Sequence, residues 1–402
     1  MTDAMRPPVS KSDAHRALVL AEVCEGRHEH LLPPAEVRPR DVDVLSRGLV
    51  TLRGEGGELD CLDAGAPFRF LVTQAALRHP HAFRFTGTPR LAERPQQPLF
   101  DALARALGTT FERGALPWPL TVRSARARPS ADFSVQAGES SQFVSSLLLG
   151  CARLVNDGVA PMSVVVDAEP ASVGYLVLTM GWLRRFGFDL HCTDIRFTVL
   201  KRTKVAPPVA LPGDWSSLTY LLPLSWCSGV PVAEVDLQVS HPDRVVVEHL
   251  ASVGLTLEHD PSGTFVRGTS SKGLTVDASL CPDAVPALVA IALRCPRPST
   301  FTQCGVLRLK ESDRLEGVAR MTEAFGGKAT ITRDRLTIEP PARPRDATFD
   351  GSDDHRLVMA AATAARLLEV NVDIRGTEAV TKSFPRFWEE AAKAGVARRE
   401  AA

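Results

Sequence analysis

The segment LKESDRL at 309–315 places two cations and a carboxylate at the expected start of a helix. Lys310 and Arg314 are four residues apart, so on a helix they share one face. Glu311 follows Lys310 directly, which puts an acid or a base within reach of any anion that the two cations bind. This arrangement is typical of an enzyme with an anionic substrate, although a solvated helix start with Asp313 as ion-pair partner fits the same residues.

Similar polar residues occur where other helices are expected to begin. Helix N-termini that combine free amide groups, hydroxyl groups and cations are suited to phosphate or carboxylate. The segments are SKSDAHRAL at 10–18, FTGTPRLAERP at 85–95, GESSQF at 138–143, EPASVGY at 169–175, CPDAVPALV at 281–289, SDDHRLVMA at 352–360 and TKSFP at 381–385. Each alone is also typical of an ordinary cap or surface turn. Because they occur in both halves of the chain, we expect them to converge on one cleft that binds phosphates and carboxylates.

Length, charge and cysteine spacing limit the class of protein. The chain has 402 residues, 44% of them hydrophobic, which matches two domains better than one. Lys plus Arg and Asp plus Glu both number 47, so no net charge favours nucleic acid or a membrane surface. The dispersed cysteines lack metal-ligand spacing and fit a reducing cytoplasm, and no apolar run approaches the ~20 residues that cross a bilayer.

The chain repeats a pattern in which a helix ends at glycine and two short strands follow. The helix-ending glycines are expected to be Gly48, Gly108, Gly187, Gly254, Gly327 and Gly395. Their recurrence predicts six related α/β units, with a hairpin within 49–62 in the first of them. The proline-rich segment KVAPPVALPGD at 204–214 predicts a linker with three units on each side. No hairpin follows the last glycine, so the missing strands are expected to come from the N-terminus.

Together these segments, with DAGAPFRFL at 63–71 and GDWSS at 213–217, resemble the 5-enolpyruvylshikimate-3-phosphate synthase family of the enolpyruvyl transferase superfamily. The resemblance runs from about Ser10 to Phe384, in family order and at comparable spacing. It implies an α/β fold of two inverse barrel-like domains, each built from three βαβαββ-type units. The first domain is expected at 11–208, and the second at 1–10 with 209–402. The active site is expected in the cleft between them.

The resemblance also implies the reaction. A member of this family transfers the enolpyruvyl group of phosphoenolpyruvate to the 5-hydroxyl of shikimate 3-phosphate and releases phosphate. The transfer proceeds by addition and elimination and serves chorismate and aromatic amino acid biosynthesis. The family needs no metal or cofactor. We expect a cytoplasmic monomer that binds these two small-molecule substrates, with no nucleic-acid or membrane partner.

The resemblance assigns a role to individual residues. Asp283 would take the proton of the acceptor hydroxyl, and Glu311 or Lys11 would protonate the methylene carbon. The residues implied for shikimate 3-phosphate are Lys11, Ser12, Arg16, Ser140, Ser141, Gln142, Ser172, Tyr175, Asp283 and Lys310. Those implied for phosphoenolpyruvate are Lys11, Gly65, Arg90, Gln142, Arg314, His355, Arg356 and Lys382.

Four departures from the family pattern leave two other hypotheses open. Asp63 and Ala66 stand where the family usually has asparagine and threonine. Ala14-His15 replaces Ser-Asn, and Val306 replaces a polar residue. The N-terminus lacks the family's hairpin, which predicts a less stable second domain or a start further upstream. The alternatives are transfer to another phosphorylated cyclitol or sugar, and a non-catalytic paralogue that binds metabolites. Retention of the acid and base residues argues against the paralogue.

Overall fold

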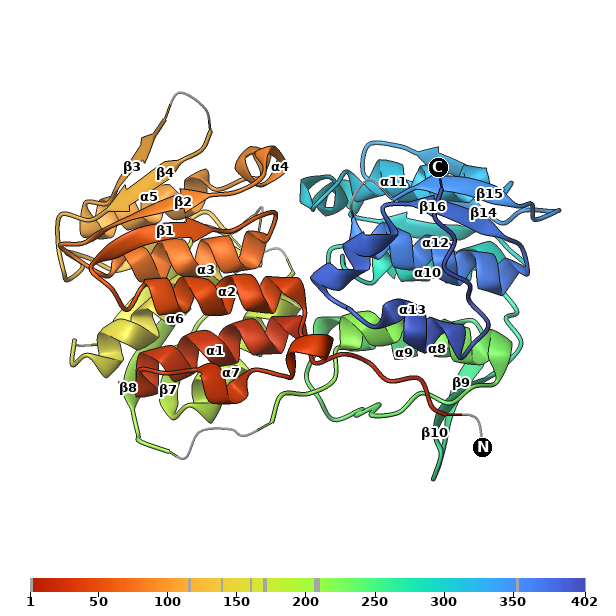
Figure 1. Ribbon diagram of the computed structural model, residues 1–402, viewed down its shortest axis with the longest axis horizontal. Coiled ribbons are helices and arrows are strands. Elements are labelled where there is room, and N and C mark those ends of the chain that lie inside the picture. The colour runs from red at the N-terminus through yellow and green to blue at the C-terminus, as the bar shows by residue number, and fades with distance from the viewer. Residues whose placement is uncertain are drawn as a thin grey trace. The chain divides into compact units, whose positions relative to one another are not determined.

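The computed structural model describes residues 3–114, 117–138, 140–159, 161–168, 172–205, 210–351 and 354–401. They form two compact lobes, shown in Figure 1 with the chain coloured from its N-terminus to its C-terminus. The N-terminal lobe consists of 11–34 and 40–211, and the C-terminal lobe of 1–10, 35–39 and 212–402. The chain changes lobe between Leu211 and Pro212. Across the described ranges, every helix is too short or too polar to span a bilayer.

The N-terminal lobe alternates helices and strands. Its helices are α1 (Lys11–Glu25), η1 (Glu29–Leu31), α2 (Arg40–Thr51), α3 (Gly65–Ala76), α4 (Pro89–Glu93), α5 (Gln97–Leu107), α6 (Ser141–Asn156) and α7 (Val173–Arg185). Its strands are β1 (Gly56–Asp60), β2 (Ala82–Thr86), β3 (Thr110–Arg113), β4 (Leu120–Arg123), β5 (Phe133–Val135), β6 (Met162–Val166), β7 (Phe188–Cys192) and β8 (Arg196–Arg202). In β5, Phe133 and Val135 are buried and Ser134 is exposed, because successive side chains of a strand point to opposite faces.

Two four-stranded sheets in this lobe share one topology. Their strand orders are β1-β2-β4-β3 and β5-β6-β8-β7. In each sheet the first two strands run parallel and the other pairs run antiparallel. The parallel pair is connected through a helix, and the antiparallel pair that follows is a hairpin. Each sheet therefore belongs to one predicted βαβαββ unit.

The C-terminal lobe contains a third sheet of the same kind, with the order β11-β12-β14-β13. The lobe's helices are η2 (Ala35–Val37), α8 (Trp215–Ser228), η3 (Pro242–Val245), α9 (Val246–Ser252), α10 (Val285–Arg294), η4 (Cys304–Leu309), α11 (Arg314–Ala324), α12 (His355–Leu368), η5 (Thr377–Lys382) and α13 (Phe387–Ala392). Its strands are β9 (Leu255–Asp260), β10 (Gly263–Gly268), β11 (Thr275–Asp277), β12 (Ser299–Thr302), β13 (Lys328–Ile331), β14 (Arg335–Glu339), β15 (Ala347–Asp350) and β16 (Val372–Arg375). Strands β9 and β10 form a hairpin, and β15 and β16 pair in parallel.

Three helices form the centre of each lobe. In the N-terminal lobe α1, α3 and α6 contact one another, and in the C-terminal lobe α8, α10 and α12 do so. These helices are buried on nearly all sides: the consecutive residues Leu147, Leu148 and Leu149 of α6 are all fully buried. A helix of this kind must be enclosed on every side. The sheets, in which many side chains are exposed, lie around the helices, the inverse of a common α/β barrel.

The termini complete the C-terminal lobe differently from the prediction. Beyond Gly395 the chain passes beside β16, where Ile374 and Glu400 form a single parallel bridge. The N-terminal segment instead pairs through Met5 with Val232, next to the β9–β10 hairpin. The bridge that extends the β15–β16 pair therefore comes from the C-terminal segment, and the expectation that the N-terminus pairs there was wrong.

Gly48 does not end a helix. Helix α2 continues to Thr51, and a turn leads from it to β1, so the hairpin predicted for 49–62 is not formed by these described residues. A Cβ atom at Gly48 would lie 2.4 Å from Cδ1 of Leu71, so the glycine permits the close approach of α2 and α3. Similarly, Gly326 rather than Gly327 has the left-handed conformation that follows α11.

Candidate active site

Arg314 joins three carboxylates in the C-terminal lobe. It is the first residue of α11, and its side chain is 1% exposed. Its Nη1 donates to Asp283 at 2.8 Å and its Nη2 to Glu311 at 2.7 Å. Its Nε donates to Asp354 at 2.8 Å. The predicted base Asp283 and the predicted acid Glu311 are therefore held by one guanidinium group.

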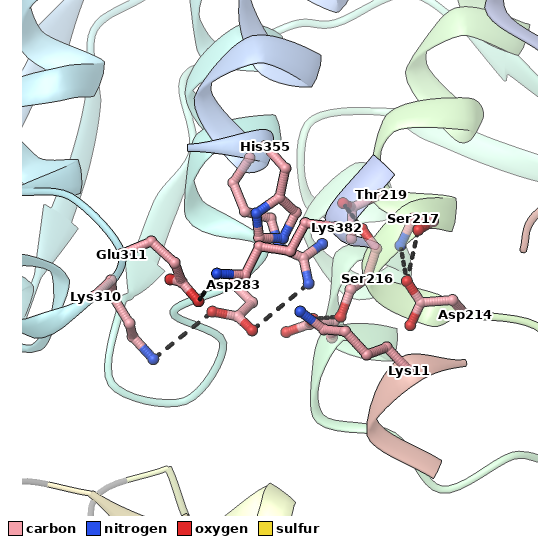
Figure 2. A network of polar contacts seen from close by, with 12 residues as sticks. Lys11, Asp214, Ser216, Ser217, Thr219, Asp283, Lys310, Glu311, His355 and Lys382 are labelled. Atoms are coloured by element: carbon pink, nitrogen blue, oxygen red, sulfur yellow. Dashed lines mark hydrogen bonds and ion pairs between the residues drawn. The ribbon is translucent and has the colours of Figure 1, made fainter. Parts of the chain in front are cut away.

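Further cations surround the two acids, as Figure 2 shows for Lys310 and Lys382. The Nζ atom of Lys310 lies 3.6 Å from Asp283, and that of Lys382 lies 3.8 Å from Glu311. Lys382 is 1% exposed, whereas Lys310 is 20% exposed. The structure thus brings together in one lobe all the site residues predicted between 283 and 382.

Two sequence interpretations of this cluster were wrong. Lys310 precedes α11, which begins at Arg314, so the two cations do not share a helix face. Asp283 does not cap α10. The N-cap residue of this helix is Ala284, and its side chain accepts no hydrogen bond from the helix backbone. The residues of the cluster come instead from the segments where α10, α11 and α12 begin, and from Lys382 at the end of η5.

The electrostatics of the cluster favour an ionised Asp283. Burial disfavours its charge, but Lys310, Arg356 and Arg314 together hold the pKa of Asp283 well below its ordinary value. The same carboxylates raise the pKa of Arg314 despite its burial, chiefly through Asp354 and then Glu311 and Asp283. Asp283 and Arg314 are therefore both charged at neutral pH, and each stabilises the charge of the other.

Arg356 differs from Arg314 in having hydrogen-bond capacity left. It is 2% exposed, and its Nη2 lies 3.6 Å from Asp283. Its Nε and Nη1 atoms have no hydrogen-bond partner within the described part of the chain. A buried guanidinium group with two unused donors is suited to bind an anion. His355 precedes it, with Nδ1 3.7 Å from Asp354, the residue that caps α12.

Helix α1 positions the predicted cations of the N-terminal lobe. Nζ of Lys11 lies 3.1 Å from Asp41, and both side chains are largely buried. Arg16 donates to Oγ1 of Thr179 at 2.7 Å and to the backbone oxygen of Tyr175 at 3.0 Å. It also donates to the backbone oxygen of Ser12, at 2.7 Å. Burial lowers the pKa of Arg16 to about 10, which leaves it charged at neutral pH.

The predicted hydroxyl and amide groups lie at the starts of α6 and α7. Ser140 caps α6 and accepts a hydrogen bond from the backbone of Gln142, with Ser141 between them. Ser172 precedes α7 in a left-handed conformation, with φ of 57°, which a non-glycine residue adopts at some cost. Tyr175 is largely buried in the first turn of α7. Positions 139, 169–171 and 352–353 of the predicted segments lie outside the described residues.

The three atoms nearest to a Cβ built on Gly65 all belong to Arg94. Arg90 is 40% exposed and pairs with Glu93 at 3.2 Å. Arg94 is 7% exposed, and a Cβ atom built on Gly65 would lie 2.4 Å from its Nη1. The guanidinium group of Arg94 therefore packs directly on the first residue of α3. Both arginines belong to TGTPRLAERP, so the motif alone did not distinguish them.

Asp63, the acid at a family asparagine position, has a cationic neighbour. Nη2 of Arg40 donates to it at 2.6 Å, with side chains 40% and 24% exposed. Asp41, which follows Arg40 in the chain, forms an ion pair with Lys11. Arg40 therefore compensates the extra negative charge at Asp63, and its neighbour in the chain, Asp41, pairs with Lys11.

The comparison with known proteins follows the same residues along the chain. A model of the family EPSP synthase (3-phosphoshikimate 1-carboxyvinyltransferase) matches residues 35–391. The chain belongs to the EPSP synthase family. Among its relatives, the 3-phosphoshikimate 1-carboxyvinyltransferase of Methanoculleus marisnigri is 34% identical over 96% of both chains. That of Methanopyrus kandleri is 32% identical over 97% of this chain and 95% of the relative.

Solved structures of EPSP synthases and a related transferase have the same fold. EPSP synthase from Acinetobacter baumannii aligns with a TM-score of 0.68 and 18% identity, over 99% of this chain and 97% of that one. The enolpyruvyl transferase NikO from Streptomyces tendae aligns with a TM-score of 0.67 and 14% identity, over 98% and 95%. These structural matches confirm the predicted inverse α/β fold.

In this EPSP synthase family member, sequence reasoning missed the residues that hold the predicted ones. Asp41 binds Lys11, and Asp354 binds Arg314. Arg69 donates to the side-chain oxygen of Gln142 at 2.5 Å and is itself 2% exposed. Buried charged residues are rare unless they are paired. Their burial depends on tertiary contacts that their local sequence does not reveal.

Proposed function

We propose that this protein transfers the enolpyruvyl group of phosphoenolpyruvate to the 5-hydroxyl of shikimate 3-phosphate, with release of phosphate. The observation that carries the proposal is the cluster in which Arg314 binds both Asp283 and Glu311, with Lys310, Arg356 and Lys382 nearby. An addition–elimination at a phosphorylated enol needs a base, an acid and several cations for developing negative charge. The cluster contains all three.

In the addition step, Asp283 accepts the proton of the 5-hydroxyl, and the hydroxyl oxygen bonds to C2 of phosphoenolpyruvate. Glu311 or Lys11 donates a proton to the methylene carbon, which gives a tetrahedral ketal phosphate. In the elimination step, the residue that gave the proton takes one back from the new methyl group, and the C2–O bond to phosphate breaks. The enol ether forms again on the acceptor, and inorganic phosphate leaves.

Substrate binding strengthens the proposed base. In the free protein, Lys310, Arg356 and Arg314 stabilise the Asp283 carboxylate, which makes it a weak proton acceptor. When anionic substrates bind these cations, part of that stabilisation moves to the substrate oxygens. The pKa of Asp283 then rises toward the range of a useful general base.

We assign the remaining residues by this chemistry. Arg16 and Ser12 bind the shikimate carboxylate, and Gln142 and Tyr175 contact the ring. The phosphate of shikimate 3-phosphate is bound by Ser140, Ser141, Ser172 and Lys310. Phosphoenolpyruvate is bound by Lys11, Gly65, Arg314, Arg356 and Lys382, and by Arg94 in place of Arg90. Support for Arg94 comes from its burial and its contact with Gly65.

We place the protein in the cytoplasm as a monomer. All eight cysteines are unpaired, and five of them are buried. Unpaired cysteines are typical of a reducing compartment. Sedimentation of the purified protein at micromolar concentration tests the monomer, and a dimer peak would contradict it.

The direct test is a reaction with both substrates. Purified protein with phosphoenolpyruvate and shikimate 3-phosphate is expected to release phosphate and to form an enolpyruvyl ether that mass spectrometry detects. Omission of either substrate is the control. The absence of product with shikimate 3-phosphate would reject the proposal.

A second candidate is transfer to another phosphorylated cyclitol or sugar, and the Arg40–Asp63 pair is the observation that favours it. The test is competition between shikimate 3-phosphate and such acceptors at equal concentration. A higher kcat/KM for another acceptor would favour the second candidate.

Gly65→Ala is expected to raise the KM for phosphoenolpyruvate about tenfold, because the new methyl group displaces Arg94. The atom that the methyl group would meet is the end of a flexible side chain, so the fold should persist. Steady-state kinetics and thermal melting check both parts. Gly181→Ala, where a Cβ atom meets nothing within 4 Å, is the matched control. An unchanged KM in Gly65→Ala would remove Arg94 from the site.

A further inference from the structure

His15 is a buried histidine near Lys11 that the proposed mechanism does not use. It is 1% exposed and lies four residues after Lys11 on α1, so both occupy the same face of the helix. Its ring meets the Phe70 ring edge-on, with 6.5 Å between centroids. Within the described residues, Nε2 of His15 has no hydrogen-bond partner. A buried polar group in this state requires a physical explanation.

The ring acts through hydrogen bonding and shape rather than through charge. Burial lowers the pKa of His15 to about 3; the Asp41 carboxylate opposes this shift, and Lys11 and Arg16 add to it. A histidine with a lowered pKa is protonated only below that value, so His15 is neutral at any pH above about 4.

The partner of the ring is the backbone of Asp41, near the start of α2. Because Nε2 has no partner, the nitrogen that makes this bond is Nδ1. The Asp41 carboxylate in turn lies 3.1 Å from Nζ of Lys11. Two residues in neighbouring turns of α1 therefore contact Asp41. His15 contacts its backbone, and Lys11 contacts its carboxylate.

Arg16 makes its hydrogen bonds away from Asp41, although its guanidinium group lies over the same Phe70 ring that His15 meets, 5.7 Å from the ring centroid. Its hydrogen bonds to Thr179 and to the Tyr175 backbone both lead to α7. Asp13 also faces α7 and accepts from the indole of Trp182 at 2.7 Å. One side of α1 therefore positions Arg16 through α7, and another positions Lys11 through α2. The hydrogen bond of His15 belongs to the second side.

We propose that His15 is a positioning residue for Lys11: its Nδ1 fixes the Asp41 backbone, and the carboxylate fixed in this way orients the Lys11 ammonium group. The role of the oriented lysine rests on the proposed function, in which Lys11 binds phosphoenolpyruvate. Loss of the contact should therefore weaken the use of phosphoenolpyruvate while the binding of shikimate 3-phosphate through Arg16 is preserved.

Three substitutions separate the two ring nitrogens. The side-chain nitrogen of asparagine can occupy the place of Nδ1, that of glutamine reaches the place of Nε2, and leucine provides neither. We expect His15→Asn to keep kcat/KM for phosphoenolpyruvate within about threefold of the parent, and His15→Gln and His15→Leu to lower it about tenfold. The KM for shikimate 3-phosphate should change less than about twofold in all three. Equal losses in the three variants, or equal losses for the two substrates, would overturn the proposal.

Chemical labelling tests the same contact without any enzymatic activity. Lys11 is one of eight lysines, so acylation by a small amine-reactive ester can be followed for each lysine by peptide mass spectrometry. The exposed Lys204 and Lys272 serve as internal references. His15→Leu is expected to speed acylation of Lys11 about threefold relative to them, and His15→Asn to leave it unchanged.

The labelling result also distinguishes this proposal from the proposed function. Faster labelling of Lys11 in His15→Leu supports the positioning role even in a protein without transferase activity. Unchanged labelling would contradict the positioning role even if the parent protein is an active transferase. A lower melting temperature combined with unchanged labelling would reduce His15 to a packing residue and would likewise overturn the proposal.

Discussion

Asp283→Asn is expected to lower kcat about a thousandfold, because the amide cannot accept the proton of the acceptor hydroxyl. Asparagine has nearly the volume of aspartate and can still accept the hydrogen bond that Arg314 donates at 2.8 Å. The KM for shikimate 3-phosphate should therefore change much less than kcat. Phosphate release under saturating substrates measures the effect.

The control for this substitution is Asp373→Asn, in the same lobe. Asp373 binds Arg399 at 2.7 Å, but both side chains are more than 40% exposed. Exposed ion pairs contribute little to stability, so this variant should be fully active. If Asp283→Asn keeps more than about a tenth of the parent kcat, Asp283 is not the general base.

The pH dependence of the free protein gives a second check on Asp283. Its pKa lies well below the ordinary value of an aspartate, about 3.9, so the carboxylate should stay ionised between about pH 5 and 8. A lowered pKa contributes stability above the ordinary value, and this contribution is lost only as the pH falls through the lower, folded value. We therefore expect no loss of kcat/KM in that window that depends on Asp283.

Much of the architecture could be predicted because it depends on local patterns. Alternating burial in strands such as β5 and the turn glycines after α5 and α7 are visible in the sequence. The exceptions depend on tertiary contacts. Gly48 looks like a helix end, but its lack of a side chain serves the contact with Leu71, which is distant in sequence. The C-terminal segment that bridges to β16 through Glu400 has no sequence pattern that identifies its partner.

The candidate site follows the same division. Motifs identified Asp283, Glu311 and Arg314, because the types and spacing of these residues resemble a known family. The contacts among them could not be predicted, since Arg314 binds residues from three separate segments. The choice between Arg90 and Arg94 also required burial, which differs strongly between two arginines of one short segment.

Asp354→Asn is expected to lower the free energy of unfolding of the C-terminal lobe by about 3 kcal/mol, because it removes one charge from a buried ion pair. Asp354 is fully buried and accepts from Arg314 at 2.8 and 3.3 Å and from Ser312 at 2.9 Å. It also caps α12 by accepting from the backbone of Arg356. Asparagine caps helices about as well as aspartate, so the substitution isolates the loss of charge.

Asp214→Asn is the matched control for Asp354→Asn. Asp214 is also buried and caps α8, but its side chain accepts hydrogen bonds from Ser217 rather than from an arginine. Urea unfolding followed by circular dichroism should show a loss of less than about 1.5 kcal/mol for this variant. Similar losses in the two variants would mean that capping, and not the pairing with Arg314, accounts for the stability that Asp354 provides. A larger loss in Asp354→Asn, with reduced affinity for phosphoenolpyruvate, is the result expected if one buried carboxylate both stabilises the lobe and orients Arg314.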